Sequence, residues 1–103
     1  MCNTVYYTAA MHLEPPLVWQ PAVVRKLWEK HRVEPGEVEE VFFDDRPHFK
    51  RHGEVYHAYG QTTAGRYLFV VFLYRGGGKA KPITAYEMTD KQRRYYQRVK
   101  GGS

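Results

Sequence analysis

The stretch Arg66–Arg75, RYLFVVFLYR, decides the fold of this 103-residue chain. Every residue between the two arginines is apolar or aromatic. A run of this length and character is typical of a central β-strand that is covered on both faces. Three glycines, Gly76–Gly78, follow it and favour the positive φ angles of a tight hairpin turn. We therefore expect an antiparallel return strand from Lys79 to about Met88.

Two further features describe the sheet around this central strand. The segment Glu54–Thr62 alternates in polarity, so that His57 and Tyr59 are expected on one face and Ala58 on the other. Pro82 falls inside the return strand, although proline has no N–H to donate to a neighbouring strand. Pro82 is therefore expected at a sheet edge or a β-bulge.

Helices are indicated on both sides of the strand region. Pro21 opens a helix with an apolar stripe that ends near Lys30-His31, and Pro35-Gly36 opens a second, shorter one. Thr89–Gln92 matches a capping box and opens a C-terminal helix. The order predicts an α+β fold: N-terminal helices packed on a twisted antiparallel sheet of three to five strands, followed by a C-terminal helix. For so short a chain we expect two layers at most.

The chain is expected to form one domain over residues 17–100. Residues 1–16 are interpreted as an N-terminal extension or, at Thr4–Ala10, an edge strand, and residues 101–103 as a flexible tail. The single cysteine, Cys2, excludes a disulfide framework and a cysteine-based metal site. His48 and His52 have a spacing that metal sites use, but no second pair completes it, so neither metal nor cofactor is expected. The absence of a long apolar run near Met1 favours a cytoplasmic protein over a secreted or membrane-spanning one.

The formal net charge of +5 favours a polyanionic partner such as RNA or an acidic protein. Metal-free RNA cleavage needs a base for the 2′-hydroxyl, an acid for the leaving oxygen, and cations for the developing phosphate charge. The residues that could supply the base and the acid are His31, His57, Glu54, Glu87 and the tyrosines. A solvated charged surface is the simpler interpretation of the same charges, and it stays open.

Several short phrases then occur in one order over residues 17–98. They are Trp19-x-Pro21, Glu29-Lys30-His31-x-Val33, Glu37-Val38-Glu39-Glu40-Val41-Phe42, Tyr59-Gly60-Gln61-Thr62, Gly65-Arg66-Tyr67-Leu68, Val70-Val71-Phe72, Ile83-Thr84-Ala85-x-Glu87-Met88-Thr89 and Arg93-x-x-Tyr96. In this order they resemble the BrnT family of type II toxin–antitoxin systems. The resemblance implies a RelE-like fold and a metal-independent ribonuclease that inhibits translation. It also implies RNA and a cognate ribbon-helix-helix antitoxin as partners, in a dimer or a hetero-oligomer with the antitoxin, and no membrane.

The resemblance and the charge pattern together suggest site residues. The candidates for catalysis are Arg66, Arg75, Glu87, His31 and Tyr86. The candidates for binding RNA or phosphate are Lys30, Lys79, Lys81, Arg93 and Tyr96. Arg66 and Arg75 would bind phosphate. Glu87 and His31 would transfer protons.

The chain departs from the expected family pattern at two positions, one of which, Tyr86, is among these candidates. Family members usually carry arginine where this chain has Tyr86, and glutamate where it has Gln92. Tyrosine keeps one donor but loses the charged fork of arginine. Tyr86 could belong to a variant mechanism, to a weakened or inactive toxin, or to an engineered substitution. The function is accordingly an endoribonuclease toxin, a non-catalytic relative that binds nucleic acid or antitoxin, or a small RNA-binding domain outside toxin biology.

Overall fold

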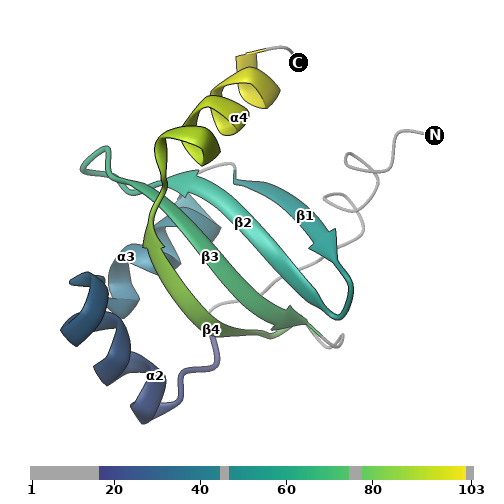
Figure 1. Cartoon of the computed structure of the whole chain (residues 1–103). Helices are drawn as coiled ribbons and strands as arrows, with labels where there is room; N and C mark the ends of the chain where they lie inside the picture. Colours follow the sequence, from purple (N-terminus) through teal and green to yellow (C-terminus); the bar gives the residue numbers. More distant parts are fainter. Residues whose placement is uncertain (1–16, 45–46, 75–77, 102–103) are drawn as a thin grey trace.

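The computed structural model describes residues 17–44, 47–74 and 78–101 (Figure 1). A four-stranded antiparallel sheet has the order β1-β2-β3-β4. The strands are β1 (His48–His52), β2 (Val55–Gln61), β3 (Tyr67–Tyr74) and β4 (Ala80–Glu87). Each strand pairs with the next along the chain, which confirms the predicted α+β class and the antiparallel return strand. The edge strand expected at Thr4–Ala10 lies outside the described residues.

Strand β3 is central, and both of its faces are covered, as its sequence predicts. Leu68, Val70 and Phe72 point to one face and belong to the larger core. Phe69 points to the other face and belongs to a second cluster with Tyr59. The polarity alternation of β2 is confirmed in the same way, because Ala58 and Tyr59 lie on opposite faces.

The larger core lies under the N-terminal helices. These are α2 (Pro21–Lys26), α3 (Pro35–Glu39) and two π-helical turns that continue them, η1 (Leu27–His31) and η2 (Glu40–Asp44). Proline stands in the first turn of both α2 and α3, where its missing N–H costs no helical hydrogen bond. Leu27, Val38 and Val41 are fully buried in the larger core cluster, which includes residues of the sheet.

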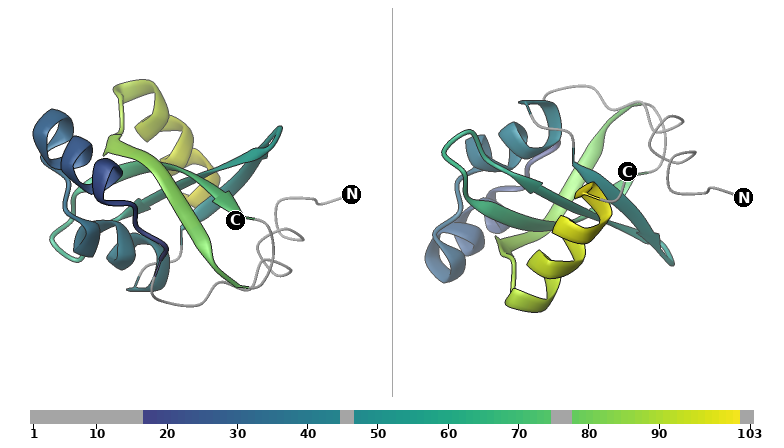
Figure 2. Two further views of the ribbon diagram at one scale, coloured as in Figure 1. Left: turned by 90° about the horizontal axis from the view of Figure 1, so that it is seen from below. Right: turned by 90° about the horizontal axis from the view of Figure 1, so that it is seen from above.

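The opposite face of the sheet is partly covered by α4 (Asp90–Gly101), as Figure 2 shows. Tyr96 is only 2% exposed and clusters with Tyr59, Phe69 and Met88. The expectation of two layers at most is therefore wrong, because the aromatic second face needs a cover and α4 provides a partial third layer.

The predicted capping box at the start of α4 is confirmed. The Thr89 backbone N–H donates to Gln92 Oε1 over 2.9 Å, and the Gln92 N–H donates to Thr89 Oγ1 over 3.2 Å. The placement of Pro82 is confirmed as well, because it lies on edge strand β4 next to a register shift at Val71/Phe72. Among the described residues, no helix is both long and apolar enough to cross a membrane.

The burial of β3 generates a stability prediction. Leu68 and Phe72 are both 0% exposed, so Leu68→Ala or Phe72→Ala should each lower the free energy of unfolding by about 2–5 kcal/mol through loss of contacts and cavity formation. Urea unfolding followed by circular dichroism measures this change. Val18→Ala is the control, because Val18 is an exposed side chain. Unchanged unfolding midpoints for both core variants would contradict the placement of β3.

Candidate functional site

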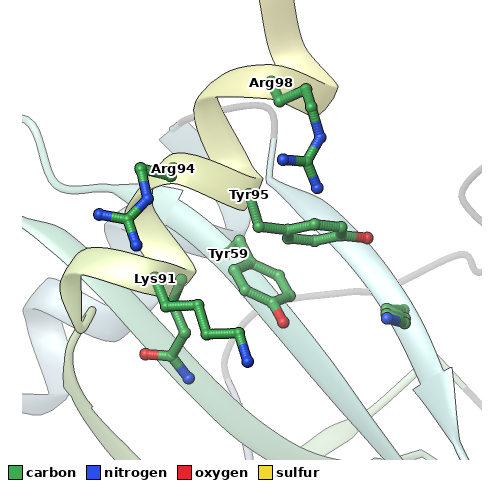
Figure 3. A pocket seen from close by; sticks show the side chains of 7 residues that line it. Tyr59, Lys91, Arg94, Tyr95 and Arg98 are labelled. Atoms are coloured by element: carbon green, nitrogen blue, oxygen red, sulfur yellow. The ribbon is translucent and has the colours of Figure 1, made fainter.

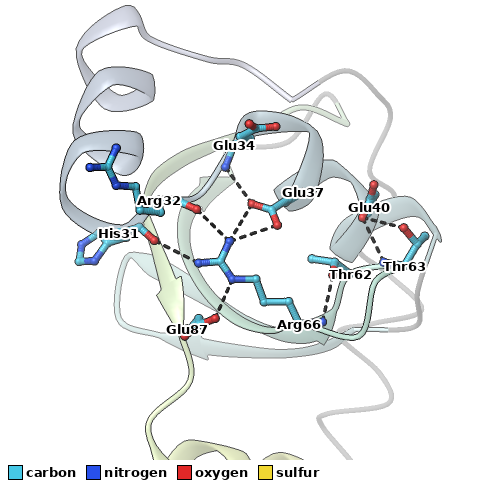
Figure 4. A network of polar contacts seen from close by, with 9 residues as sticks. All are labelled: His31, Arg32, Glu34, Glu37, Glu40, Thr62, Thr63, Arg66 and Glu87. Atoms are coloured by element: carbon cyan, nitrogen blue, oxygen red, sulfur yellow. Dashed lines mark hydrogen bonds and ion pairs between the residues drawn. The ribbon is translucent and has the colours of Figure 1, made fainter.

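Arg66 is fixed in place by the tight turn between β2 and β3. The Thr62 N–H donates to the Arg66 carbonyl over 2.9 Å, and the Arg66 N–H donates to Thr62 Oγ1 over 3.0 Å. Gly65 has φ +92°, a backbone conformation that residues with a Cβ rarely adopt. The turn therefore directs the arginine side chain away from β3 and toward the N-terminal helices (Figure 4).

The guanidinium of Arg66 donates through all three of its nitrogens to acceptors on other elements (Figure 4). Nε donates to Glu87 Oε2 over 2.8 Å, at the end of β4. Nη1 donates to Glu37 Oε1 over 2.9 Å, in the first turn of α3, and to the Arg32 carbonyl over 2.9 Å. Nη2 donates to the His31 carbonyl over 3.1 Å. One side chain thus connects the end of η1, the start of α3 and the end of β4.

The electrostatics of this cluster favour a permanently charged arginine. Burial alone lowers the pKa of Arg66, but its hydrogen bonds to Glu87 and Glu37, and their negative charges, raise the pKa above its ordinary value. Direct binding of a phosphate by Arg66 remains a prediction. The geometry supports a role for Arg66 in positioning the Glu87 carboxylate and the His31 backbone.

Three of the predicted catalytic residues line one open hollow of about 520 Å³, which we call the His31 hollow. It is lined by His31, Tyr86, Glu87 and Thr89. The imidazole and phenol rings lie with their centroids 5.6 Å apart. The Glu87 side chain is 63% exposed, so its carboxylate can meet a solvent-borne ligand although it accepts a bond from Arg66. Tyr86 Oη in turn accepts a bond from Gln92 Nε2 over 3.4 Å.

Of the predicted phosphate-binding residues, Arg93 lies beside the His31 hollow and Lys30 adjoins His31 in the sequence. Arg93 shares a smaller depression of about 220 Å³ with Arg66 and Glu87, and its guanidinium carbon lies 4.4 Å from the ring centroid of Tyr67. Lys30 is exposed and immediately precedes His31 in η1. Cationic groups are therefore available at the edge of the hollow.

The remaining predicted residues are not brought together there. Lys81 lies at the opposite end of β4 from Glu87, about 20 Å along the strand, and Lys79 immediately precedes that end. Arg75 lies outside the described residues. Tyr96 is only 2% exposed and lies in the second core cluster, so its predicted role in binding phosphate or RNA stays a prediction that its burial does not favour.

A second concave surface, which we call the α4–β1 groove, has a volume of about 330 Å³ (Figure 3). It is lined by Lys50, Tyr59, Lys91, Gln92, Arg94, Tyr95 and Arg98. The spacing of Lys91, Arg94 and Arg98 is a sequence signal for a basic stripe on one helix face. The groove itself could not be predicted from that spacing, because Lys50 joins it from a distant strand.

A histidine–tyrosine contact holds α4 beside β1 at this groove. His48 Nε2 and Tyr95 Oη are 3.0 Å apart. Burial, with a smaller contribution from the charge of Lys50, lowers the pKa of His48, which favours the neutral ring that can accept the phenol proton. His48 and His52 have a spacing that metal sites use, but among the described residues no group of three or more His, Cys, Asp or Glu side chains is placed to hold a metal ion.

The Arg66 network generates a second stability prediction. Arg66→Met should lower the free energy of unfolding by about 2 kcal/mol, because hydrogen bonds to charged groups contribute about 1.5–3 kcal/mol and partial exposure weakens them. Thermal or urea unfolding measures the loss. Arg25→Met is the matched control, since Arg25 is an exposed arginine on α2. Equal, small losses for the two variants would show that the network contributes little.

Comparison with known proteins identifies the family. A family described as the ribonuclease toxin BrnT of type II toxin–antitoxin systems matches residues 19–92. Among solved structures, the Brucella abortus ribonuclease toxin BrnT is similar in fold, with a TM-score of 0.59 and 16% sequence identity, over 72% of this chain and 96% of that chain. A search of curated proteins finds no significant match. Because the family match spans well over half of the sequence, the chain belongs to the BrnT family of ribonuclease toxins of type II toxin–antitoxin systems.

Proposed function

We propose that this chain is a metal-independent endoribonuclease whose active site is the His31 hollow. The observation that carries the proposal is the convergence of an imidazole from η1 with a phenol and a carboxylate from the end of β4. These groups can accept and donate protons without a metal ion. Membership of the BrnT family supports RNA as the substrate.

The proposed reaction is an internal transesterification. The Glu87 carboxylate takes the proton of a ribose 2′-hydroxyl as its oxygen attacks the adjacent phosphorus. The bond from phosphorus to the 5′-oxygen breaks, and protonated His31 gives its proton to that leaving oxygen. The products are a 2′,3′-cyclic phosphate and a 5′-hydroxyl. Tyr86 can donate its phenol proton in a hydrogen bond to a non-bridging phosphate oxygen.

Charge for the phosphate would come from the rim of the hollow. Arg93 is exposed in the depression that shares Glu87 with the hollow, and the exposed Lys30 immediately precedes His31, so both are candidates to bind the phosphate. Arg66 acts through its neighbours: it holds the Glu87 carboxylate and the His31 backbone, and so sets their separation. Lys79 and Lys81, at the other end of β4, would contact only more distant nucleotides.

The biological part of the proposal follows from family membership. Cleavage of RNA would inhibit translation in the cytoplasm, and a cognate antitoxin with a ribbon-helix-helix domain would neutralise the toxin. The net charge of +5 suits an acidic antitoxin segment as well as RNA. We infer a dimer or a hetero-oligomer with the antitoxin as the silent form.

A second candidate function is supported by Tyr86 itself. This side chain carries no charge where the family pattern has arginine, and its ring lies between His31 and Phe69, with centroids 5.6 and 5.3 Å away. A ring held in this way lines the hollow without supplying a phosphate clamp. The chain would then be a weakened or inactive relative that binds nucleic acid or antitoxin.

Cleavage of an end-labelled RNA by the purified protein, with chelator present, tests the first candidate. Glu87→Gln and His31→Gln should each lower the cleavage rate by about 10²–10⁴-fold, because each removes a proton-transfer group. Matched controls are Glu54→Gln and His52→Gln, which alter exposed residues of the same types outside the hollow. If the Glu87 and His31 variants cleave as fast as wild type, the active site is misplaced.

Tyr86→Arg separates the two candidates. An added guanidinium beside the hollow should raise the cleavage rate by stabilising phosphate charge, so wild type and variant both cleave if the first candidate is correct. Cleavage by Tyr86→Arg alone would identify the natural chain as a disarmed member of the family. Cleavage by neither protein would contradict the first candidate for free RNA and favour a binding role.

A further inference from the structure

The α4–β1 groove has a chemistry that the proposed reaction does not use. We propose that it binds the sugar–phosphate backbone of single-stranded RNA and leads the strand toward the His31 hollow. The choice of RNA as the ligand rests on the proposed function; the argument for a polyanion rests on the groove alone.

The first argument is the unbalanced charge of the groove. Its four cations are Lys50, Lys91, Arg94 and Arg98, and no carboxylate lines it. All four are exposed, and within residues 17–44, 47–74 and 78–101 none of them forms an ion pair with a carboxylate. A concave surface of a single charge sign attracts a polyanion and releases counterions when it binds one.

The second argument is that two of the four cations, Lys50 and Arg98, are held in position by the Tyr95 ring. Lys50 Nζ lies 5.1 Å and Arg98 Cζ lies 5.7 Å from the centroid of the Tyr95 ring. That ring is itself fixed, because it contacts Tyr59 with centroids 5.1 Å apart and its hydroxyl meets His48 Nε2. Cation–π contacts keep the ammonium and guanidinium groups over the groove. Less conformational entropy is then lost when a phosphate binds.

The third argument is the length and direction of the basic stripe. Lys91 and Arg98 are seven residues apart on α4, which is about 10 Å along the helix and long enough for more than one nucleotide. Gln92 lines the groove and also donates to Tyr86 Oη, in the wall of the His31 hollow. The groove and the hollow are therefore neighbours, and a strand that leaves one can enter the other.

The same charges would also attract an acidic protein segment, but the groove combines its cations with the partly exposed ring of Tyr95. Single-stranded nucleic acids are bound by positively charged grooves that carry aromatic rings. The combination favours RNA, and binding of an acidic segment is one outcome of the test.

The test measures binding separately from cleavage. The probe is a dye-labelled 2′-O-methyl RNA oligonucleotide, which cannot be cleaved because it has no 2′-hydroxyl, and the readout is fluorescence anisotropy across a salt series. Arg94→Gln/Arg98→Gln should weaken binding at least tenfold at low salt. It should also lower the slope of log Kd against log salt by about 1.4, since each phosphate contact to a single strand contributes about 0.7.

The matched control is Arg25→Gln/Lys26→Gln, which removes two exposed cations from α2 on the other side of the sheet. It should bind within about twofold of wild type, and both double variants should keep the wild-type melting temperature. Equal losses in the two variants, or no loss in the groove variant, would overturn the proposal. If the Arg94→Gln/Arg98→Gln variant still binds the RNA probe but no longer binds poly-L-glutamate, the groove is instead a site for an acidic protein.

A ribodinucleotide, which is too short to occupy the groove and the hollow together, separates this proposal from the nuclease. The groove variant should cleave the dinucleotide at the wild-type rate but cleave a long RNA more slowly at limiting concentration. If wild type cleaves neither RNA yet binds the 2′-O-methyl probe through Arg94 and Arg98, the nuclease proposal fails and the groove proposal stands.

Discussion

The guanidinium of Arg66 joins the helical layer to the sheet, and the arrangement of the proposed site depends on it. The carbonyls of His31 and Arg32 come at the end of η1, where backbone acceptors no longer have helical partners. Arg32 adopts a left-handed conformation with φ 54°, which ends the helix there. Arg66 satisfies both carbonyls while pairing with Glu37 and Glu87. The apolar contacts between helices and sheet would otherwise fix their distance but not their relative orientation, since hydrophobic burial has no direction.

The hydrogen bonds of Arg66 also position two of the residues that line the His31 hollow. The backbone of His31 and the carboxylate of Glu87 bind the same guanidinium, so one side chain sets the separation of that backbone from the carboxylate. An acid and a base that must act on the two ends of one phosphodiester need such a fixed separation. The residue that stabilises the fold therefore also orders the proposed site, without itself having to touch the substrate.

Most of the fold could be predicted from short-range patterns, whereas the site could be predicted only in part. The apolar run of β3, the capping box at Thr89 and the exceptional position of Pro82 each reflect local backbone chemistry, and all were confirmed. The role of Arg66 could not be predicted, because two of its acceptors are backbone carbonyls, which every residue has. The position of α4 on the second face was missed because helical periodicity shows which side of a helix is apolar but not which layer will cover it.

Tyr86 and Gln92, the two positions at which the sequence is expected to depart from the BrnT pattern, are in contact with each other. Gln92 Nε2 donates to Tyr86 Oη over 3.4 Å, while Gln92 Oε1 accepts the Thr89 N–H of the capping box. One amide thus joins the first turn of α4 to the end of β4. Because this pair carries no charge, positive charge for a phosphate in the proposed site would have to come from a neighbouring cation such as Arg93.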